Sequence, residues 1–328
     1  MKNKALLGLS VLALSLTSCG VNAHHDMSEY VLSTAYHDNY RILQLTDLHI
    51  GDKENQDIHY KFLDLTIKDA NADFIVVTGD LFTFASKDTA KRLFAFLDSY
   101  QKPWTVVFGN HDEQCTFSVD WLTGYLNEKT SYGLFKDIQD DDVHGNCNFA
   151  INLMNGNSIF EQLILMDTNR YYYGDYFGYD FVKPDQIDWY ERLIDYTTAQ
   201  NGGTVVPSTM FYHIPLPEID DAWDGSQNGD PNAVYEYGEK REDTCPPKYN
   251  SGLFEKILAK GSTHAMFFGH DHINNFRVVY KGVTFCYGIK STDTVYFDED
   301  MMGGQVITLH NDHSLTYEHI YHTYGEVK

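Results

Sequence analysis

Basic residues are scarce in this sequence of 328 residues: 24 Lys and Arg stand against 47 Asp and Glu, which gives a formal net charge of −23. Such a charge opposes binding to DNA, RNA or anionic lipid headgroups through a general electrostatic field. We therefore expect no nucleic-acid polymer among the partners, and we interpret the acidic surface as a feature of solubility. A protein of this charge that handles phosphate would need bound cations to reverse the sign locally.

Long apolar runs are also missing: after residue 16, no segment is apolar enough to cross a membrane. The short apolar run of residues 5–16 follows Lys2 and Lys4, which is typical of an export signal. It ends in Leu16-Thr17-Ser18-Cys19-Gly20, which resembles the lipobox of bacterial lipoproteins. That resemblance implies cleavage before Cys19 and diacylation of its sulfur; the alternative is an ordinary signal peptide with an incidental cysteine.

These features predict three parts of the chain. Residues 1–18 would be a lipoprotein signal peptide, residues 19–39 a lipidated cysteine followed by a polar tether, and residues 40–328 the folded domain. We expect the mature protein in the bacterial cell envelope, exported from the cytoplasm and held at the membrane only through its N-terminal lipid.

Cysteine is rare as well, and the few that are present do not settle the redox state. Four remain when Cys19 is set aside, and four cysteines allow three pairings. Export permits disulfides, yet Cys286 lies inside an apolar run, where a buried free thiol is equally compatible. The pairing of Cys115, Cys147, Cys245 and Cys286 therefore stays open.

The chain has no repeat or low-complexity tract, and its 43% hydrophobic content supports a substantial core. Apolar strand patterns alternate with amphipathic helical patterns, which favours a central sheet with helices packed outside. Strands are expected at residues 41–46, 74–78, 104–108, 209–212 and 264–268, and helices at residues 60–70, 87–100, 119–128 and 252–260 and from Pro184 onward.

The remaining patterns point to hairpins. Residues 148–153 and 162–166 flank Asn155-Gly156, a strong two-residue turn signal, and further hairpins follow residue 276. A four-layer α/β/β/α sandwich of two mixed sheets flanked by helices therefore fits better than one doubly wound sheet. Residues 216–250 show no clear period and are expected to form a long acidic loop, of a length that is usually functional or mobile.

Groups that suit divalent metals follow the apolar strands. Strand ends of an α/β sheet converge on one rim, so these groups can meet there. Two cations roughly 3.5–4 Å apart can activate a water and clamp a phosphate ester. Mixed nitrogen and oxygen ligands admit manganese, iron, zinc or cobalt. The motifs are Asp47-Leu48-His49, Gly79-Asp80, Gly109-Asn110-His111-Asp112, His213 and Gly269-His270-Asp271-His272.

In this order and spacing the motifs resemble the calcineurin-like metallophosphoesterase family, over roughly residues 40–310. Residues around Asp47, His213 and His270 further resemble the branch that contains the yeast Dcr2 phosphatase and plant purple-acid-phosphatase-like proteins. Thr83 stands where true purple acid phosphatases have an iron-binding tyrosine, so no tyrosinate-to-iron colour is expected. The resemblance implies one metal on Asp47, His49 and His272, a second on Asn110, His213 and His270, and Asp80 as the bridge.

Two further groups of residues are candidates for catalysis and substrate binding. His111, next to a ligand, is suited to protonate the leaving oxygen because the pKa of histidine lies near neutral pH; the alternative is a loop histidine that binds backbone. Asp112 would orient His111 or cap the following turn. Arg170 could grip a phosphate oxygen, and Tyr171 and Tyr173 could stack on a base or sugar, unless this segment is an ordinary surface loop.

The sequence thus predicts an exported dinuclear metal-dependent phosphoesterase, with phosphomonoesters favoured and a small phosphate ester or a phosphoprotein as substrate. One alternative is a phosphodiesterase that acts on nucleotides or lipid headgroups. Another is a surface binding lipoprotein that keeps the fold without turnover.

Overall fold

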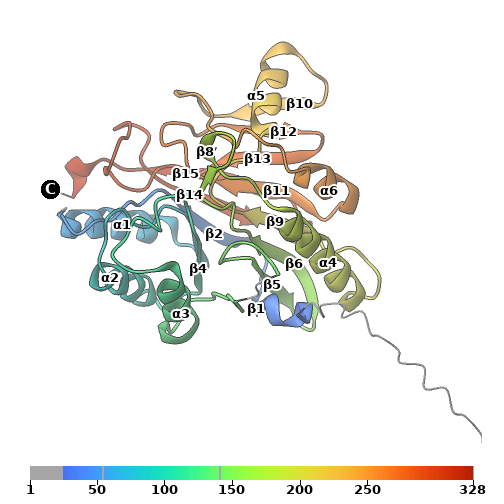
Figure 1. Ribbon diagram of the computed structural model, residues 1–328, viewed down its shortest axis with the longest axis horizontal. Coiled ribbons are helices and arrows are strands. Elements are labelled where there is room, and N and C mark those ends of the chain that lie inside the picture. The colour runs from blue at the N-terminus through green and yellow to red at the C-terminus, as the bar shows by residue number, and fades with distance from the viewer. Residues whose placement is uncertain (1–24, 54, 140–141, 328) are drawn as a thin grey trace, which may run out of the picture.

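The computed structural model describes residues 25–53, 55–139 and 142–327, which form two mixed β-sheets between two sets of helices (Figure 1). The four-layer α/β/β/α sandwich predicted from the sequence is thereby confirmed. In spatial order, the five-stranded sheet contains β15 (Leu315–Tyr321), β14 (Gly303–Leu309), β2 (Tyr40–Leu45), β3 (Phe74–Thr78) and β4 (Trp104–Val107). The eight-stranded sheet contains β1 (Val31–Ala35), β5 (Phe149–Asn155), β6 (Ser158–Leu165), β9 (Ser208–Phe211), β11 (Thr263–Phe268), β13 (Val283–Tyr287), β12 (Arg277–Tyr280) and β10 (Ala233–Tyr237).

Helices cover the outer face of each sheet. On one side lie α1 (Gln56–Ala70), α2 (Lys87–Asp98) and α3 (Val119–Lys129); on the other lie α4 (Pro184–Gln200) and α6 (Leu253–Lys260), with α5 (Glu218–Asn228) beside β10 (Figure 1). Ser86 and Ser118 cap the N-termini of α2 and α3 through their side chains, and Gly261 ends α6 in a left-handed conformation.

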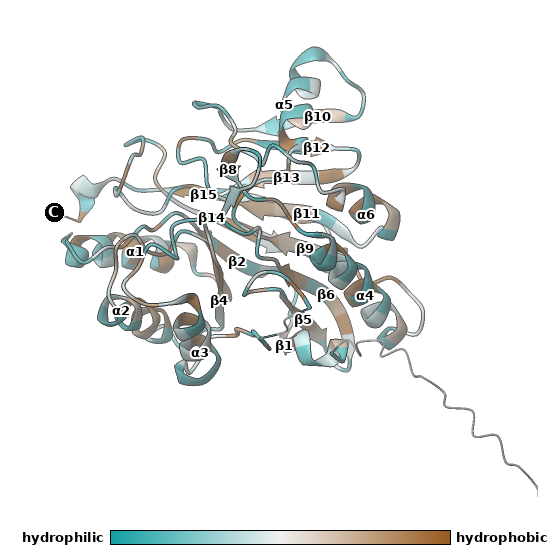
Figure 2. Cartoon of the chain, in the orientation of Figure 1, coloured by the Kyte–Doolittle hydropathy of each residue, from teal (hydrophilic) through white to brown (hydrophobic). Residues whose placement is uncertain are grey.

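The core is divided by the eight-stranded sheet because neighbouring residues of a strand point to opposite faces. In β9 and β11, Phe211 and Phe267 face the other sheet, whereas Met210 and Met266 belong to the second core, under α4 and α6. In Figure 2, hydrophobic colour follows most of the strands, whereas the helices carry both hydrophobic and hydrophilic colour. The eight-stranded sheet is therefore buried on both faces, against the other sheet and against the helices, and this packing fixes the position of its strand ends.

The strands that lead to the predicted ligands are parallel within each sheet. β2, β3 and β4 run parallel, and so do β9 and β11. Their carboxyl ends are therefore on one rim, where single bridges, Thr46 to Lys290 and Ile50 to Phe82, link the loops. The rim brings together residues that are up to 225 positions apart in the sequence, from Asp47 to His272.

Three expectations about local structure were wrong. Residues assigned to the tether include a 3-10 helix, η1 (Met27–Tyr30), and β1, which pairs with β5 at the edge of the sheet. The acidic segment 216–250 contains α5 and β10 rather than a structureless loop. In the β5–β6 hairpin Asn155 pairs with Ser158, so the turn lies at residues 156–157, one position later than expected.

The structure describes only some of the features that bear on cellular location, since its first described residue is His25. The predicted signal peptide and Cys19 lie outside the described residues. Cys115, Cys147, Cys245 and Cys286 are all free thiols, and among the described residues no helix is both long and apolar enough to span a membrane.

Candidate metal centre

Four of the predicted ligands hold the same unusual backbone conformation at the ends of their strands. Asp47, His49, Asp80 and His270 have φ values of 54°, 45°, 49° and 78°. A side chain in this left-handed region costs roughly 1–3 kcal/mol, and such residues cluster where function requires them. The sharp turn that follows each strand aims the ligand side chain back into the rim instead of along the strand direction.

Two glycines of the motifs are needed because their neighbours approach too closely for a side chain. A Cβ on Gly79, whose φ is 88°, would lie 2.4 Å from Nδ1 of His213. A Cβ on Gly109 would lie 2.2 Å from Oδ1 of Asp80. The glycines in the Gly-Asp and Gly-Asn-His-Asp motifs thus make room for ligands supplied by another strand.

The first half of the site is a compact group of two carboxylates and two imidazoles. One ligand atom from each of Asp47, His49, Asp80 and His272 lies within 4.8 Å of the others, and all four residues are buried. Nε2 of His272 lies 3.4 Å from Oδ1 of Asp47 and 3.0 Å from Nε2 of His49. These are the side chains expected around the first metal, together with the bridging residue.

Asp80 lies between the two halves. Its Oδ2 is 3.4 Å from Nε2 of His49, which belongs to the first half, and 3.3 Å from Nε2 of His213, which belongs to the second. Its Oδ1 accepts a hydrogen bond from the backbone N–H of His111. One carboxylate oxygen that faces an imidazole on either side is placed to bridge two cations.

The second half contains three buried ligand atoms that make no hydrogen bond. They are Oδ1 of Asn110, Nε2 of His213 and Nε2 of His270. Buried polar atoms are nearly always satisfied in native proteins, so three orphans in one place indicate a missing partner. The three residues are those that the sequence assigns to the second metal, and a divalent cation with nitrogen and oxygen ligands fits all three atoms.

Three of the ligand histidines have Nδ1 hydrogen-bonded to an oxygen atom of the protein, which orients the ring so that Nε2 faces the other ligands. Nδ1 of His49 bonds Oγ1 of Thr83 at 2.8 Å, and Nδ1 of His213 and of His272 bond the carbonyl oxygens of Thr78 and Tyr296 at 2.8 and 2.9 Å. A metal-binding histidine is generally held in this way, which fixes its tautomer and leaves Nε2 for the cation.

The electrostatics of the protein groups favour cation binding. Although burial favours the neutral acid, the imidazoles of His213 and His49 hold the pKa of Asp80 well below its usual range. Burial also opposes a charge on His213, yet the Asp80 carboxylate raises the pKa of His213 to about 10. Burial lowers the pKa of His270 to about 3, which keeps that ring neutral and able to ligate. Binding of a cation by His213 would release the proton of that ring, because a histidine ligates only through an unprotonated ring nitrogen.

His111 lies at the edge of this group. Its ring centroid is 4.9 Å from that of His49, and its Nδ1 contacts the side-chain oxygen of Gln114 at 2.9 Å. The alternative of a ring bonded to backbone is thus not what the structure shows. Asp112 does not orient it: the Asp112 carboxylate accepts hydrogen bonds from the backbone N–H groups of Gly109 and Phe82. These bonds lead back to Gly109 and across to Phe82, so the capping of the following turn considered for Asp112 is not observed either, and the side chain that contacts the His111 ring is that of Gln114.

Of the three predicted substrate residues, Tyr171 alone is seen in contact with a predicted metal ligand. Tyr171 reaches the site, because its hydroxyl accepts a hydrogen bond from Nδ2 of Asn110 at 3.0 Å. Tyr173 is 75% exposed. Arg170 is directed elsewhere: Nη2 contacts Oδ1 of Asn146 at 3.3 Å and Nε lies 3.7 Å from Glu113.

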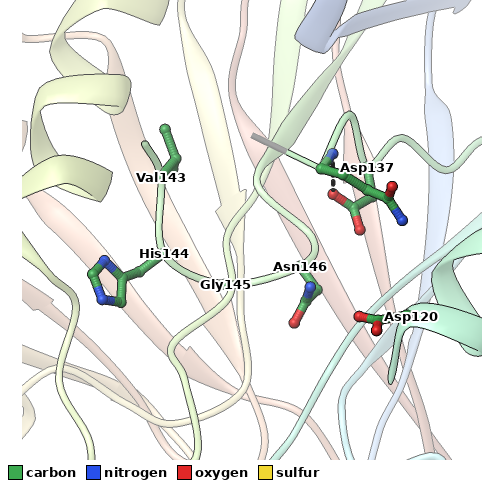
Figure 3. Close-up of a pocket in the computed structure, with 7 residues that line it drawn as sticks. Asp120, Asp137, Val143, His144, Gly145 and Asn146 are labelled. Atoms are coloured by element: carbon green, nitrogen blue, oxygen red, sulfur yellow. Dashed lines mark hydrogen bonds between the residues drawn. The ribbon is translucent and has the colours of Figure 1, made fainter. Parts of the chain in front are cut away.

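Asn146 lines a separate surface cleft of about 410 Å³, which contains none of the predicted metal ligands. Figure 3 shows Asp120, Asp137 and Asn146 gathered on one side of this cleft and His144 on the other. The Arg170 side chain is therefore placed by cleft residues and Glu113 rather than by the metal centre.

Several residues of the site were not found from the sequence. Nζ of Lys290, only 1% exposed, donates to the backbone oxygen of Asp47 at 2.8 Å. Tyr296 stacks on His272 with ring centroids 4.1 Å apart, and Tyr179 meets His270 edge-on at 4.3 Å. None of these three residues lies in one of the sequence motifs.

Comparison with known proteins agrees with this geometry. Residues 40–274 match the calcineurin-like phosphoesterase family. The chain belongs to that family. The match includes all seven predicted metal ligands, from Asp47 to His272.

Relatives of this family member include plant and yeast proteins. A probable inactive purple acid phosphatase (number 14) of Arabidopsis thaliana is 29% identical over 86% of this chain and 78% of its own length. The phosphatase DCR2 of Saccharomyces cerevisiae is 26% identical over 72% of this chain and 44% of its own length. The expected branch is thereby confirmed.

The fold is also found in solved structures. A dimetal phosphatase from Danio rerio has a TM-score of 0.53 at 12% identity, over 86% of this chain and 99% of its own. GAP50, described as the anchor in the inner membrane complex of Plasmodium, has a TM-score of 0.50 at 15% identity, over 89% and 87% of the two chains. These likenesses concern the fold alone.

Proposed function

We propose that this protein is a hydrolase that cleaves phosphate esters with two divalent cations, and that phosphomonoesters are its preferred substrates. The observation that carries the proposal is the position of Asp80, with one oxygen between imidazoles of the two half-sites, beside two buried ligand atoms, Oδ1 of Asn110 and Nε2 of His270, that make no hydrogen bond. The ligand side chains are almost fully buried, which favours entry of a terminal phosphate group over one substituted on both sides.

Each protein group has a defined task in this proposal. When bound, two divalent cations would lower the pKa of a water nucleophile and offset the charge on the phosphoryl oxygens. His49 and His272 would hold one cation with Asp47, and Asn110, His213 and His270 the other. With Nδ1 of His111 bonded to Gln114, its Nε2 is the atom available to pass a proton to the leaving oxygen.

The test joins metal analysis to hydrolysis assays of the full chain. p-Nitrophenyl phosphate and bis-p-nitrophenyl phosphate would be compared with added manganese and with EDTA. We expect two equivalents of metal, hydrolysis mainly of the monoester, and loss of activity with EDTA. Asp80→Asn should lose both metal and activity, and Asp224→Asn, an exposed carboxylate on α5, should lose neither.

Two other outcomes would replace the proposal. Faster hydrolysis of the bis ester would favour the phosphodiesterase alternative, with nucleotides or lipid headgroups as substrates. A protein that binds metal but hydrolyses neither ester would favour the binding lipoprotein. The names of the plant relatives, probable inactive purple acid phosphatases, are the observation that favours this alternative.

We further propose, from the sequence, that Cys19 carries a diacyl lipid which holds the protein at the outside of the cytoplasmic membrane. Radiolabelled palmitate should enter the wild-type protein and not Cys19→Ala, and globomycin should block maturation. A mature form that is unlipidated and insensitive to globomycin would exclude the anchor without affecting the assignment of the metal centre.

A further inference from the structure

A short hairpin of aromatic residues lies directly against the second half of the metal centre. Its strands are β7 (Tyr171–Tyr173) and β8 (Phe177–Tyr179), which pair Tyr171 with Tyr179 and Tyr173 with Phe177. Because side chains alternate along a strand and paired residues share a face, these four rings lie on one face of the hairpin. We call Tyr171, Tyr173, Phe177 and Tyr179 the aromatic face.

The aromatic face begins at the metal ligands. Tyr179 meets the ring of His270 at a centroid distance of 4.3 Å, and the hydroxyl of Tyr171 bonds Nδ2 of Asn110. Both His270 and Asn110 belong to the second half-site, the one with the unpartnered ligand atoms.

From there the rings run outward in contact with one another. Tyr171 stacks on Tyr179 at 5.9 Å and on Phe177 at 5.8 Å with an interplanar angle of 16°, and Phe177 lies 5.4 Å from Tyr173. At the outer end Tyr173 is 75% exposed and Phe177 is 70% exposed. A continuous row of rings thus connects buried metal ligands with solvent.

The opposite face of the hairpin is already occupied. Tyr172 and Tyr176 pack against the ring of Tyr249 at 5.7 and 5.3 Å, and the Tyr249 hydroxyl donates to Asp175 in the turn. One face therefore fixes the hairpin to the domain, while the aromatic face is left to present its rings. Tyr173 and Phe177 form an exposed patch with neighbouring rings in contact, and contiguous patches of this kind mark surfaces that bind ligands or partners.

Charge near the hairpin limits what that ligand can be. Arg170, which precedes β7, is held by Glu113 and Asn146. The charge of Arg170 is thereby offset by Glu113, so this arginine is not presented to a second phosphate group. Stacked rings instead attract flat apolar surfaces in offset or edge-to-face geometry.

We propose that the aromatic face binds the planar ring of a phosphate monoester whose alcohol part is aromatic, such as an aryl phosphate or a nucleoside monophosphate. This inference rests on the proposed phosphoesterase function and names its substrate class. In an aryl phosphate the ring would lie on Tyr171 and Tyr179, next to the ligands. In a nucleoside monophosphate the sugar would place the ring farther out, on Phe177 and Tyr173.

The test compares substrates that share the phosphate and differ in the ring. 1-Naphthyl phosphate, adenosine 5′-monophosphate and glycerol 3-phosphate would be assayed with wild type and with the double variant Tyr173→Ser/Phe177→Ser. Each lost ring contact should weaken binding about 3- to 10-fold. The variant should raise KM for the ring substrate that stacks there and leave glycerol 3-phosphate unchanged. The control is Val234→Ser/Tyr235→Ser, two exposed residues of β10, which should change no KM.

The outcomes separate the two claims. A preference for adenosine 5′-monophosphate over glycerol 3-phosphate that the hairpin variant loses supports binding of the ring at Phe177 and Tyr173. A preference for 1-naphthyl phosphate that the variant keeps supports binding at the inner rings of the aromatic face. Equal KM for all three substrates, or the same change in the β10 control, overturns it while phosphoesterase function stands.

A binding measurement tests whether the aromatic face binds a planar ring, independently of whether the protein hydrolyses phosphate esters. Calorimetry with phenylphosphonate and methylphosphonate, which are not hydrolysed, should show tighter binding of the phenyl compound both to wild type and to the hairpin variant, because the variant keeps the inner rings Tyr171 and Tyr179. If the protein hydrolyses nothing yet prefers phenylphosphonate, the proposed function fails and the aromatic face remains. Equal binding of both compounds contradicts the aromatic face.

Discussion

Gly109→Ala tests whether the position of Asp80 controls the metal centre. In the structure a Cβ on residue 109 would lie 2.2 Å from Oδ1 of Asp80 and 2.4 Å from its backbone nitrogen. The backbone of Gly109 is not in the left-handed region, so alanine is opposed by crowding and not by φ. The substitution thus perturbs one ligand by one methyl group.

The size of the effect follows from the geometry. Because carbon contacts are normally about 3.5 Å or longer, the Asp80 carboxylate or the loop must move by roughly 1 Å. A misplacement of about 1 Å can cost about 10²-fold in rate, and overpacking should cost about 1–3 kcal/mol of stability. The shift also strains the 2.8 Å hydrogen bond from the N–H of His111 to the same oxygen.

The assay measures bound metal, kcat/KM for p-nitrophenyl phosphate and urea unfolding. Gly124→Ala is the matched control: Gly124 lies within α3, and a Cβ there would meet nothing within 4 Å. It should keep full activity and gain about 0.5–1 kcal/mol of stability, since glycine weakens a helix. If Gly109→Ala binds metal and turns over substrate like wild type, our account of Asp80 is incorrect.

Three further predictions concern other parts of the molecule. Thr83→Val removes the hydroxyl that holds Nδ1 of His49, so metal affinity measured by competition with a chelator should fall about 10–100-fold. His111→Ala should reduce kcat about 10²–10⁴-fold with metal content unchanged; loss of metal would instead make this residue a ligand. The third is Glu161→Gln, remote from the site. The bond to buried Glu161 raises the pKa of His313, so the stabilisation is complete below the ordinary histidine pKa and is lost as pH rises through the raised value. The variant should therefore lose more stability at pH 6 than at pH 9 by urea unfolding, by less than about 1 kcal/mol because the histidine is 38% exposed. An equal loss at both values of pH would contradict it.

How far the sequence predicts the fold depends on how much each element buries. β3 is buried at all five positions and was predicted at residues 74–78, the bounds that the structure has. β1 has only half-buried and exposed residues, and its partner β5 lies far along the chain, so no local pattern marks it. In α5, only Glu218, Ile219 and Ala222 are buried, too few for a clear helical period.

The same contrast holds within the metal centre, for a different reason. The ligands could be predicted because Asp, Asn and His residues occur together in several short motifs, each directly after an apolar strand, so Asp47 or His270 stands out in the sequence. The groups that orient the histidine rings do not stand out in the sequence. They are the carbonyl oxygens of Thr78 and Tyr296, and every residue has a backbone carbonyl. Only the fold, which brings β3 beside His213 and the loop of Tyr296 beside His272, makes these two oxygens part of the site. A substitution at Thr78 can therefore keep its carbonyl and leave the ring of His213 in place, whereas a shift of the β3 backbone would misdirect that ring with every ligand side chain still present.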